Sequence, residues 1–432
     1  MIKRGQLNKT YRKVLMISYY APPINTPAAI RVGKFAKYFP EFGWKATILT
    51  VKDLDYYQKD PALFTGVNEE DICRTESLDP LRLMKLMKSK KNLGESLHKS
   101  KEGLTNKIKT FFPIDDKVGW MPFCYSAGKK ILKRDSYDAI YCTLGGTNAH
   151  AIVAYKLAKK YNIPLLVEQR DPWADHIFTK YNWYNKVLNN YWENKVLSFA
   201  DKIITVTKGL KTLIENKYNF PKEKVSVIYN GYDDFIKDKQ TIPKDDYLTF
   251  TFAGNMYKDI TPKDLFDALV DEKETKIRIR FIGNFRNKFL ELKEDFEKNV
   301  GENILVEVIP RLKKSALNDY LHSSDLLLIF LPNRARADEI LTTKLFDYLP
   351  YKKPILAFCP KNGELAEMIE NGNLGFVADA GDKEDAMKQI KKIIELKKNG
   401  ELNSVCGSDE FITQFTRKKI TQQMAAKLDE LI

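Results

Sequence analysis

The chain alternates short apolar runs with segments of helical periodicity along almost its whole length, and this alternation restricts the folds open to it. Apolar runs at 13–18, 139–144, 165–169 and 202–207 have the continuous hydrophobic character of buried parallel strands. After the first run, apolar residues recur at helical spacing from Ala28 to Phe39, and Gly43 ends that helix before the next strand. We therefore predict an α/β protein built from doubly wound parallel sheets.

The alternation restarts once, after a polar stretch near residue 236. The later runs lie at 248–255, 277–284, 304–310, 326–330 and 354–358. A length of 432 residues allows two domains, each with its own core. We expect a first Rossmann-like domain at 1–235, a linker at 236–247, a second Rossmann-like domain at 248–410 facing the first across a cleft, and one continuous helix at 411–432.

The net charge of +14 has two possible explanations. The positive charge either attracts an anionic partner or serves only to keep the protein soluble. Lipid head groups, a polyphosphate-linked substrate and nucleic acid are the possible anions. Residues 80–112 are rich in lysine with interspersed Leu, Met and Phe, so they are either a solvated helix or a basic amphipathic surface that touches a membrane. The sequence has no RNA-recognition or helix-turn-helix pattern, so we expect no nucleic-acid partner.

No window holds 18 consecutive apolar residues, and the basic N-terminus lacks the features of a signal peptide. We therefore expect a cytoplasmic protein. The five cysteines are scattered without CxxC spacing, and the four histidines show neither HxxxH nor HExxH. The sequence thus predicts no disulfide framework and no metal site.

In the first half, two loops follow strands where ligands bind in such sheets. The loop after the first strand holds Asn25 and Thr26, and Arg31 lies in the first turn of the next helix, either exposed or in contact with an acceptor. In GGTNAH (145–150), Gly146 allows close approach of a ligand, and Thr147 or Asn148 can cap the helix. His150 either packs in the core or contacts an acceptor.

The segment EQRDPW (168–173) ends a buried strand with three ionisable groups in four residues. These groups form either a structural ion-pair network or part of a catalytic cleft, and we favour the cleft. Asp171 or Glu168 would orient a hydroxyl nucleophile, and Arg170 would neutralise a phosphate.

In the second half, two strands end alike, in FAGN and FIGN. A glycine at a strand end permits close approach of nucleotide phosphates, although tight turns explain it too. Around these ends we select Gly254, Asn255, Lys258, Lys263, Gly283 and Arg286 as donor-binding candidates.

The segment EILTTKLFD (339–347) follows an apolar strand and a loop that holds Arg336. We expect Glu339 at the mouth of a helix and Asp347 along it, with Thr343 and Lys344 between them, so that the acids accept hydrogen bonds from sugar hydroxyls while helix amides face an anion. The alternative is that the acids only complement the helix dipole.

These segments together resemble the GT-B glycosyltransferases, in particular the retaining family 4. The resemblance rests on SYYAPP, KYFPEFGWKATILT, RDPW, VIYNGYD, FAGNMY, SSDLLLIFLP and KLFDYLPYKKPILA. In that family the segment similar to 339–347 is the E-x7-E motif. The resemblance implies that Glu339 contacts the donor sugar, that Asp347 contacts the ribose, and that the last helix crosses back onto the first domain.

The sequence departs from the family pattern at two of these places. Relatives often carry an Arg directly after the strand glycine and a Lys a few residues later. Here Asn255 takes the first position, Lys258 or Lys263 matches the second, and Arg336, Lys344 or Arg286 would supply the remaining charge. Arg170 stands where many relatives have His.

The resemblance implies a retaining transfer without a metal or other cofactor, with the nucleotide-diphosphate sugar as co-substrate. We expect transfer to a saccharide or lipid-linked acceptor in surface polysaccharide or glycolipid biosynthesis, peripherally at the inner face of the cell membrane. The alternatives are a sugar-nucleotide epimerase on the same fold and a non-enzymatic polyanion-binding protein.

Overall fold

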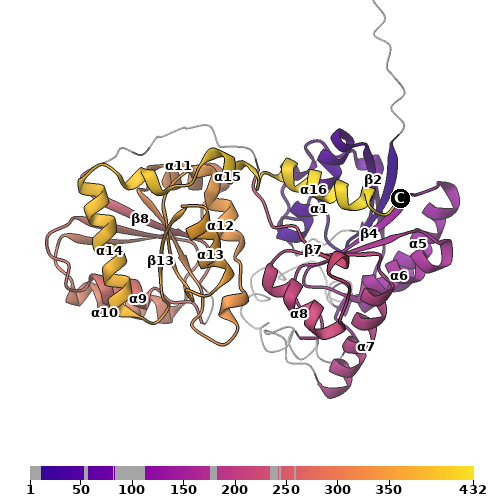
Figure 1. Cartoon of the computed structure of the whole chain (residues 1–432), viewed down its shortest axis with the longest axis horizontal. Coiled ribbons are helices and arrows are strands. Elements are labelled where there is room, and N and C mark those ends of the chain that lie inside the picture. The colour runs from indigo at the N-terminus through magenta and orange to yellow at the C-terminus, as the bar shows by residue number, and fades with distance from the viewer. Residues whose placement is uncertain are drawn as a thin grey trace, which may run out of the picture. The chain divides into compact units, whose positions relative to one another are not determined.

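The computed structural model describes residues 11–52, 57–80, 82, 112–175, 182–233, 242, 245–256 and 259–432. The chain divides into two compact units, Met1–Tyr229 with Lys418–Ile432, and Asn230–Arg417 (Figure 1). Most of the basic segment 80–112 and Lys258 lie outside the described residues.

The first unit is built on a parallel sheet with the strand order β3-β2-β1-β4-β5-β6-β7 among the described residues. Residues of β1 alternate between two cores: Leu15 and Ile17 face one, and Val14 and Met16 face the other. The strands are β1 (Arg12–Ile17), β2 (Trp44–Val51), β3 (Ile72–Thr75), β4 (Ala139–Leu144), β5 (Leu165–Gln169), β6 (Lys202–Thr205) and β7 (Val225–Val227).

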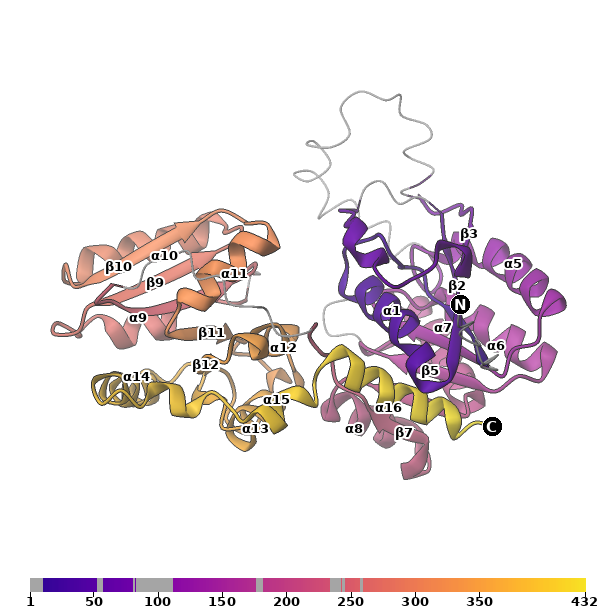
Figure 2. The same ribbon diagram turned by 90° about the horizontal axis from the view of Figure 1, so that it is seen from above.

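Helices cover both faces of this sheet, as Figure 2 shows. Helices α5 (Met121–Arg134), α6 (Ala149–Tyr161) and α7 (Trp183–Phe199) lie side by side over one face, together with α8 (Lys208–Tyr218). Helix α1 (Pro27–Tyr38) covers the other face. It begins with Thr26 as N-cap and Pro27 in its first position, the arrangement expected at a helix start.

The second unit has a parallel sheet with the order β10-β9-β8-β11-β12-β13. Its core is rich in stacked phenylalanines, and the Phe266 and Phe296 rings lie 4.2 Å apart. The strands are β8 (Leu248–Ala253), β9 (Ile277–Ile282), β10 (Ile304–Ile309), β11 (Leu326–Phe330), β12 (Ile355–Phe358) and β13 (Gly375–Ala378). The helices are α9 (Lys263–Leu269), α10 (Asn287–Asn299), α11 (Lys314–Ser323), α12 (Thr343–Tyr348), α13 (Glu364–Asn371), α14 (Lys383–Lys398) and α15 (Asp409–Thr413).

The predicted doubly wound α/β architecture is confirmed, and the strands predicted from apolar runs are present. Two strands were missed, β3 and β13. Each has four residues and lies at a sheet edge with a neighbour on one side only. Edge strands need less apolar sequence than central ones, so these two left no long apolar run to find.

The prediction of one continuous helix at 411–432 is wrong. The structure has α15 and then α16 (Arg417–Asp429), because the backbone between them pairs with another segment. The Tyr232 N–H donates to the Phe415 carbonyl at 3.0 Å, and the Arg417 N–H donates to the Tyr232 carbonyl at 2.8 Å. These bonds replace the helical ones.

Helix α16 packs on the first unit, whose core takes up Ile420, Met424 and Leu428. The Trp44 indole N–H donates to Asp429 at 2.8 Å. The end of the chain is thus part of the unit that its beginning builds. None of the helices in the described ranges combines the length and apolar character needed to cross a bilayer.

Candidate functional site

The carboxyl ends of β8 and β9 meet through two glycines. A Cβ atom on Gly283 would lie 2.1 Å from the Gly254 carbonyl oxygen, so the two backbones touch. Their φ angles of +155° for Gly283 and +136° for Gly254 are ones that L side chains rarely adopt. The two strand ends selected from the sequence are therefore adjacent and tightly packed.

The ammonium group of Lys344 lies directly above Gly254. A Cβ on Gly254 would be 2.4 Å from Lys344 Nζ, and this nitrogen is 5.2 Å from the centre of the Phe252 ring. Desolvation lowers the pKa of Lys344, and the charge of Asp347 opposes that change. The φ of +136° favours a glycine here, and a Cβ atom would also require the Lys344 ammonium to move.

Asp347 lies three residues after Lys344 on α12, so both side chains are on neighbouring positions of the helix surface. Asp347 is exposed to solvent, yet desolvation by the surrounding protein raises the pKa of its carboxyl. Arg417, Lys344 and Lys314 oppose that rise. Lys314 and Arg417 were not singled out in the sequence, since they come from distant segments that only folding brings near Asp347.

Helix α12 is fixed to the end of β8 by its next residue. The Tyr348 hydroxyl accepts the backbone N–H of Ala253 at 3.0 Å. This bond connects the helix that carries Lys344 and Asp347 to the strand that ends at Gly254. Nothing in the local sequence around Tyr348 indicates this role.

Glu339 does not lie at the mouth of α12, and this part of the prediction is wrong. It ends a short 3-10 turn, Ala337–Glu339, while α12 begins at Thr343 with Thr342 as N-cap. The Glu339 carboxylate accepts three hydrogen bonds of 2.6–3.0 Å from the Arg336 guanidinium. Arg336 adopts a φ of +64°, which ends the preceding loop sharply.

The remaining donor-site candidates lie in varied surroundings. Asn255 and Arg286 are exposed, and Arg286 stands just before α10. The Lys263 ammonium forms an ion pair with Asp267 on its own helix. The described structure thus brings Gly254, Gly283, Lys344 and Asp347 together, whereas Lys263 is engaged elsewhere.

In the first unit, Arg31 and Glu168 form a buried ion pair. Their side chains are 1% and 0% exposed, and Arg31 Nε lies 2.8 Å from Glu168 Oε1. The other Arg31 nitrogens donate to the carbonyls of Ile228 and Tyr229. Glu168 Oε2 accepts from the hydroxyls of Tyr141 and Thr143.

This geometry argues against the roles that we expected for Arg31 in acceptor contact and Glu168 in catalysis. Both side chains are enclosed and hydrogen-bonded to protein. The pair lowers the pKa of Glu168 even though burial opposes that change. The structural ion-pair network, the alternative that the sequence left open, fits these two residues.

Arg170 differs from them. Its Nη1 would lie 3.3 Å from a Cβ on Gly145, so the guanidinium rests against that glycine. Its Nε is buried without a hydrogen-bond partner in the described part of the chain. Burial lowers the pKa of Arg170, which Glu168 opposes, and Asp171 beside it is exposed. A partly accessible cation with an unused donor can hold an anion.

The segment that carries Arg170 and Asp171 is fixed by α7. The Trp173 indole donates to Asn189 at 2.6 Å, and Glu193 accepts from Gln169 at 3.0 Å and from Lys217 at 2.7 Å. Polar residues on the inner face of α7 therefore hold the loop after β5.

The GGTNAH segment is capped by a residue that the sequence did not suggest. Neither Thr147 nor Asn148 provides a side-chain cap for α6. Asp115 does so instead, since its carboxylate accepts the Ala149 N–H at 3.0 Å and the Asn148 N–H. Gly146, with a φ of +73°, is exposed and has open space at its Cβ position.

His150 is a core residue, and this burial argues against contact with an acceptor. It is 1% exposed, its Nε2 donates to the Thr143 carbonyl at 2.8 Å, and its ring lies 5.9 Å from that of Trp120. Desolvation lowers the pKa of His150 to about 4. Of the other acceptor candidates, Thr26 caps α1 and Asn25 is exposed.

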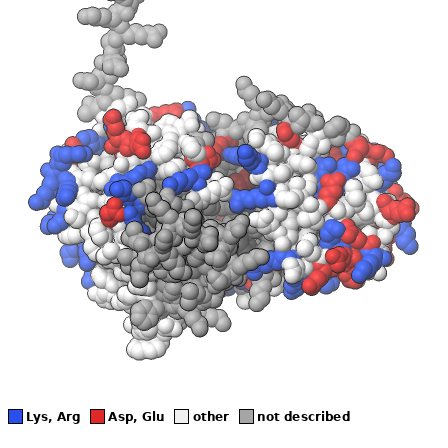
Figure 3. Space-filling view, turned by 180° about the vertical axis from the view of Figure 1, so that it is seen from behind, with Lys and Arg blue, Asp and Glu red and all other residues white. Residues whose placement is uncertain are grey.

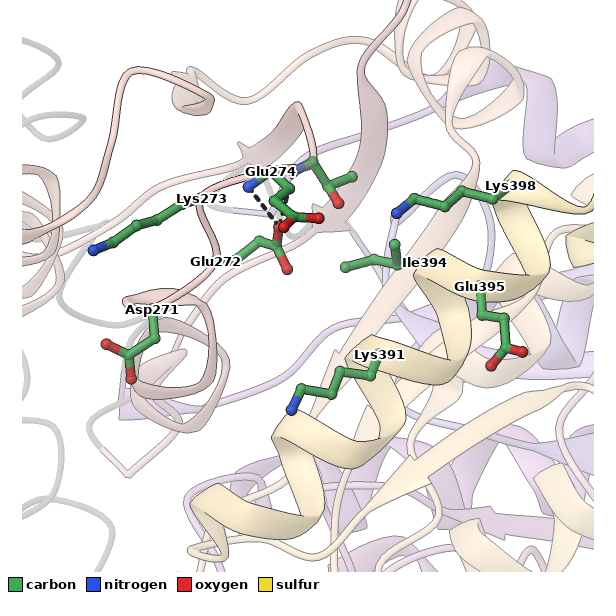
Figure 4. A pocket seen from close by; sticks show the side chains of 9 residues that line it. Asp271, Glu272, Lys273, Glu274, Lys391, Ile394, Glu395 and Lys398 are labelled. Carbon is green, nitrogen blue, oxygen red and sulfur yellow. Dashed lines mark hydrogen bonds between the residues drawn. The ribbon is translucent and has the colours of Figure 1, made fainter.

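A separate hollow of about 540 Å³ lies between α14 and the segment before β9 (Figure 4). Charges of both signs line it, and Glu272 accepts the backbone N–H groups of Glu274 and Thr275. It sits at the amino end of β9, away from Gly254 and Gly283. Within the described residues, no group of three or more His, Cys, Asp or Glu side chains is arranged to hold a metal.

Two family models match the chain. The model for Glycosyltransferase Family 4 matches residues 89–234, and the model for Glycosyl transferases group 1 matches residues 233–408. Together they span most of both units. The chain therefore belongs to the GT-B glycosyltransferases of family 4, group 1, and is a transferase. This membership decides against the epimerase and the non-enzymatic polyanion binder.

No curated protein matches the sequence. Among solved structures, Alr3699/HepE from Anabaena in complex with UDP is 15% identical with a TM-score of 0.62, covering 97% of this chain and 100% of that one. Sucrose-phosphate synthase from Thermosynechococcus elongatus is 14% identical with a TM-score of 0.61, covering 97% and 99%. The galactosyltransferase WaaB of the lipopolysaccharide outer core is 14% identical with a TM-score of 0.59, covering 97% and 100%. These likenesses show the fold.

Removing one partner of the buried pair should destabilise the first unit. Arg31→Met leaves the Glu168 charge buried and unpaired, so we expect a loss of about 3–5 kcal/mol. All five tryptophans lie in this unit, so tryptophan fluorescence during urea unfolding measures its stability. The control is Arg12→Met, whose exposed partner is Asp429 and whose loss should be under about 1 kcal/mol. Equal effects would contradict the structural role.

The contact between strand ends predicts that Gly283→Ala is poorly tolerated. The new methyl group would overlap the Gly254 backbone, so we expect a loss of about 3 kcal/mol or more in the second unit. Gly400→Ala, which has a φ of +75° and no neighbour at the Cβ position, should cost only about 1 kcal/mol. Hydrogen exchange of the β8 and β9 amides measures the difference. Similar protection in both variants would show that the contact is absent.

His150 should make stability depend on pH. The folded protein keeps the ring neutral down to about pH 4, whereas the unfolded chain protonates it below its ordinary pKa of 6.5. This contribution is therefore present above pH 6.5 and is lost as the pH falls towards 4, by about 2 kcal/mol at pH 5. The test compares the free energy of urea unfolding of wild type and His150→Gln at pH 7.5 and at pH 5. All other titrating groups are the same in both proteins, so the change in their difference between the two pH values reports His150 alone. An unchanged difference would contradict it.

Proposed function

We propose that this enzyme transfers a sugar from a nucleotide-diphosphate donor to a saccharide or lipid-linked acceptor. The observation that carries the proposal is the position of Lys344 above Gly254, beside Asp347, at the carboxyl ends of β8 and β9. This edge of a parallel sheet is where nucleotides bind in doubly wound folds. The complexes of Alr3699/HepE with UDP and with UDP-glucose support a nucleotide sugar as the donor.

In this proposal the second unit binds the donor. The Lys344 ammonium contacts the diphosphate, and its partial desolvation strengthens that contact. Asp347 accepts hydrogen bonds from the ribose hydroxyls. Glu339 accepts hydrogen bonds from the donor sugar, with its orientation held by Arg336.

The first unit would bind the acceptor near the ends of β4 and β5. Arg170 is the cation best placed to hold an acceptor phosphate, because it has an unused donor and lies against Gly145. Asp171 is exposed beside it, and Gly146 and Asn25 leave room for a ligand.

The bond that breaks joins the anomeric carbon to the diphosphate oxygen, and the bond that forms joins that carbon to the acceptor oxygen, whose proton passes to the departing diphosphate. Lys344 stabilises the negative charge that develops on the departing diphosphate. Holding both substrates in place supplies the rest of the acceleration. Retention of the anomeric configuration and transfer without a metal rest on the family resemblance.

Nucleotide binding tests this assignment. A thermal-shift screen of UDP-, GDP- and dTDP-sugars identifies the donor, and calorimetry then compares variants. We expect Lys344→Ala to weaken the nucleoside diphosphate about tenfold or more while leaving the nucleoside unaffected, since it removes a contact to charged oxygens. Asp347→Ala should weaken both, and Glu339→Ala should weaken the sugar nucleotide more than the diphosphate.

The control variant is Lys361→Ala, whose ammonium pairs with Asp385. It should bind the nucleotide like the wild type. Failure of the wild-type protein to bind any nucleotide sugar would overturn the donor assignment, and an unchanged affinity in Asp347→Ala would remove the ribose role.

A further inference from the structure

Over the first half of α7, polar side chains face the protein interior and large apolar side chains face solvent. The inner face of α7 is polar: Asn185, Asn189 and Glu193 are buried, and Asn189 and Glu193 hold the loop after β5. On the opposite face, Trp183, Val187 and Tyr191 recur every four residues and are 80%, 63% and 53% exposed. Tyr184 beside them is 38% exposed.

The stripe residues Trp183, Val187 and Tyr191 are more exposed than buried in the described part of the chain. Monomeric proteins rarely group large apolar residues on a surface without a use for them, whereas single exposed ones are common. The stripe Trp183–Val187–Tyr191 is therefore a candidate contact surface.

The helix layer around this stripe is basic. Helices α5, α6 and α7 carry four, three and two Lys or Arg residues, and their single acid, Glu193, is buried. Lys156, Lys159 and Lys160 of α6 are exposed and have no acidic partner among the described residues. Figure 3 shows Lys and Arg gathered along the outer margin of the first unit.

The cations and the aromatic stripe are continuous. The Lys195 ammonium donates to the Tyr191 hydroxyl at 2.8 Å and lies 5.3 Å from the Trp192 ring. Lys156 of α6 lies 5.9 Å from the same ring. The basic surface and the apolar stripe therefore form one face, which we name the α5–α7 face.

We propose that the α5–α7 face docks on an anionic lipid bilayer. Tryptophan and tyrosine favour the interface between hydrocarbon and water, and lysines beside them contact lipid phosphates. Long lysine stems cover apolar surface while their charges stay in water, which suits that interface. This surface goes beyond the proposed transfer and does not depend on it.

Two other occupants fit less well. A second copy of the chain placed across a two-fold axis would bring this basic face against itself and repel. A nucleic-acid duplex would satisfy the lysines, but its bases are stacked inside and offer no apolar surface to Trp183 and Val187.

Vesicle co-sedimentation of the full chain tests the proposal. Phosphatidylcholine vesicles with phosphatidylglycerol are compared with phosphatidylcholine vesicles alone. The stripe variant is Trp183→Ser, Val187→Ser and Tyr191→Ser, and the charge variant is Lys156→Glu, Lys159→Glu and Lys160→Glu. We expect the wild type to prefer the anionic vesicles, and each variant to lose binding by about tenfold or more.

The matched control is Lys288→Glu with Leu290→Ser on α10, an exposed pair on a helix that carries charges of both signs. It should bind vesicles like the wild type, and circular dichroism checks that every variant folds. Quenching of tryptophan fluorescence by brominated lipid should fall in Trp183→Phe.

Three results would overturn the proposal. One is equal binding to both vesicles or to neither. Another is unchanged binding in both variants. The third is that the variants keep vesicle binding but lose another interaction. Loss of self-association, measured by sedimentation velocity, would assign the face to a second copy, and loss of duplex-DNA binding would assign it to nucleic acid.

Discussion

The arrangement of the second unit depends on one close approach between backbones. Gly254 and Gly283 touch at the ends of β8 and β9, and the absence of side chains there leaves room for the Lys344 ammonium. Tyr348 then connects the helix of Lys344 to the backbone of β8. A partly desolvated cation is thereby held at a sheet edge, next to a carboxyl whose pKa is raised. Such a position suits an anionic ligand, because the negative charge of the ligand would stabilise the Lys344 ammonium.

The first unit shows how similar residues take different roles a short distance apart. Glu168 and Arg170 are two positions apart on the chain. Glu168 points into the core, where Arg31, Tyr141 and Thr143 satisfy it, while Arg170 lies against Gly145 with a donor unused. Strand alternation would place residues two positions apart on the same face, but β5 ends at Gln169, so Arg170 belongs to the loop that follows and does not share the surroundings of Glu168. The charged residues at the end of β5 therefore do not act together as one binding site.

Helix α7 both supports the loop after β5 and carries the exposed aromatic stripe. Its polar inner face holds the loop after β5 through Asn189 and Glu193. Because polar residues take the inner positions, the aromatic ones are left outside. The exposed stripe thus follows from the support that this helix gives to the segment of Arg170.

The amino-acid pattern alone predicts the doubly wound fold, the positions of the central strands and the two strand-end glycines, because buried parallel strands need continuous apolar runs and a close backbone approach needs glycine. It also indicated the family through local motifs. Local patterns failed where partners are distant in sequence: Asp115 caps α6, Tyr232 interrupts the last helix, and Arg31 pairs with Glu168. Which charged residues are enclosed and which are accessible becomes known only from the folded chain, since burial depends on what the rest of the chain packs against each side chain.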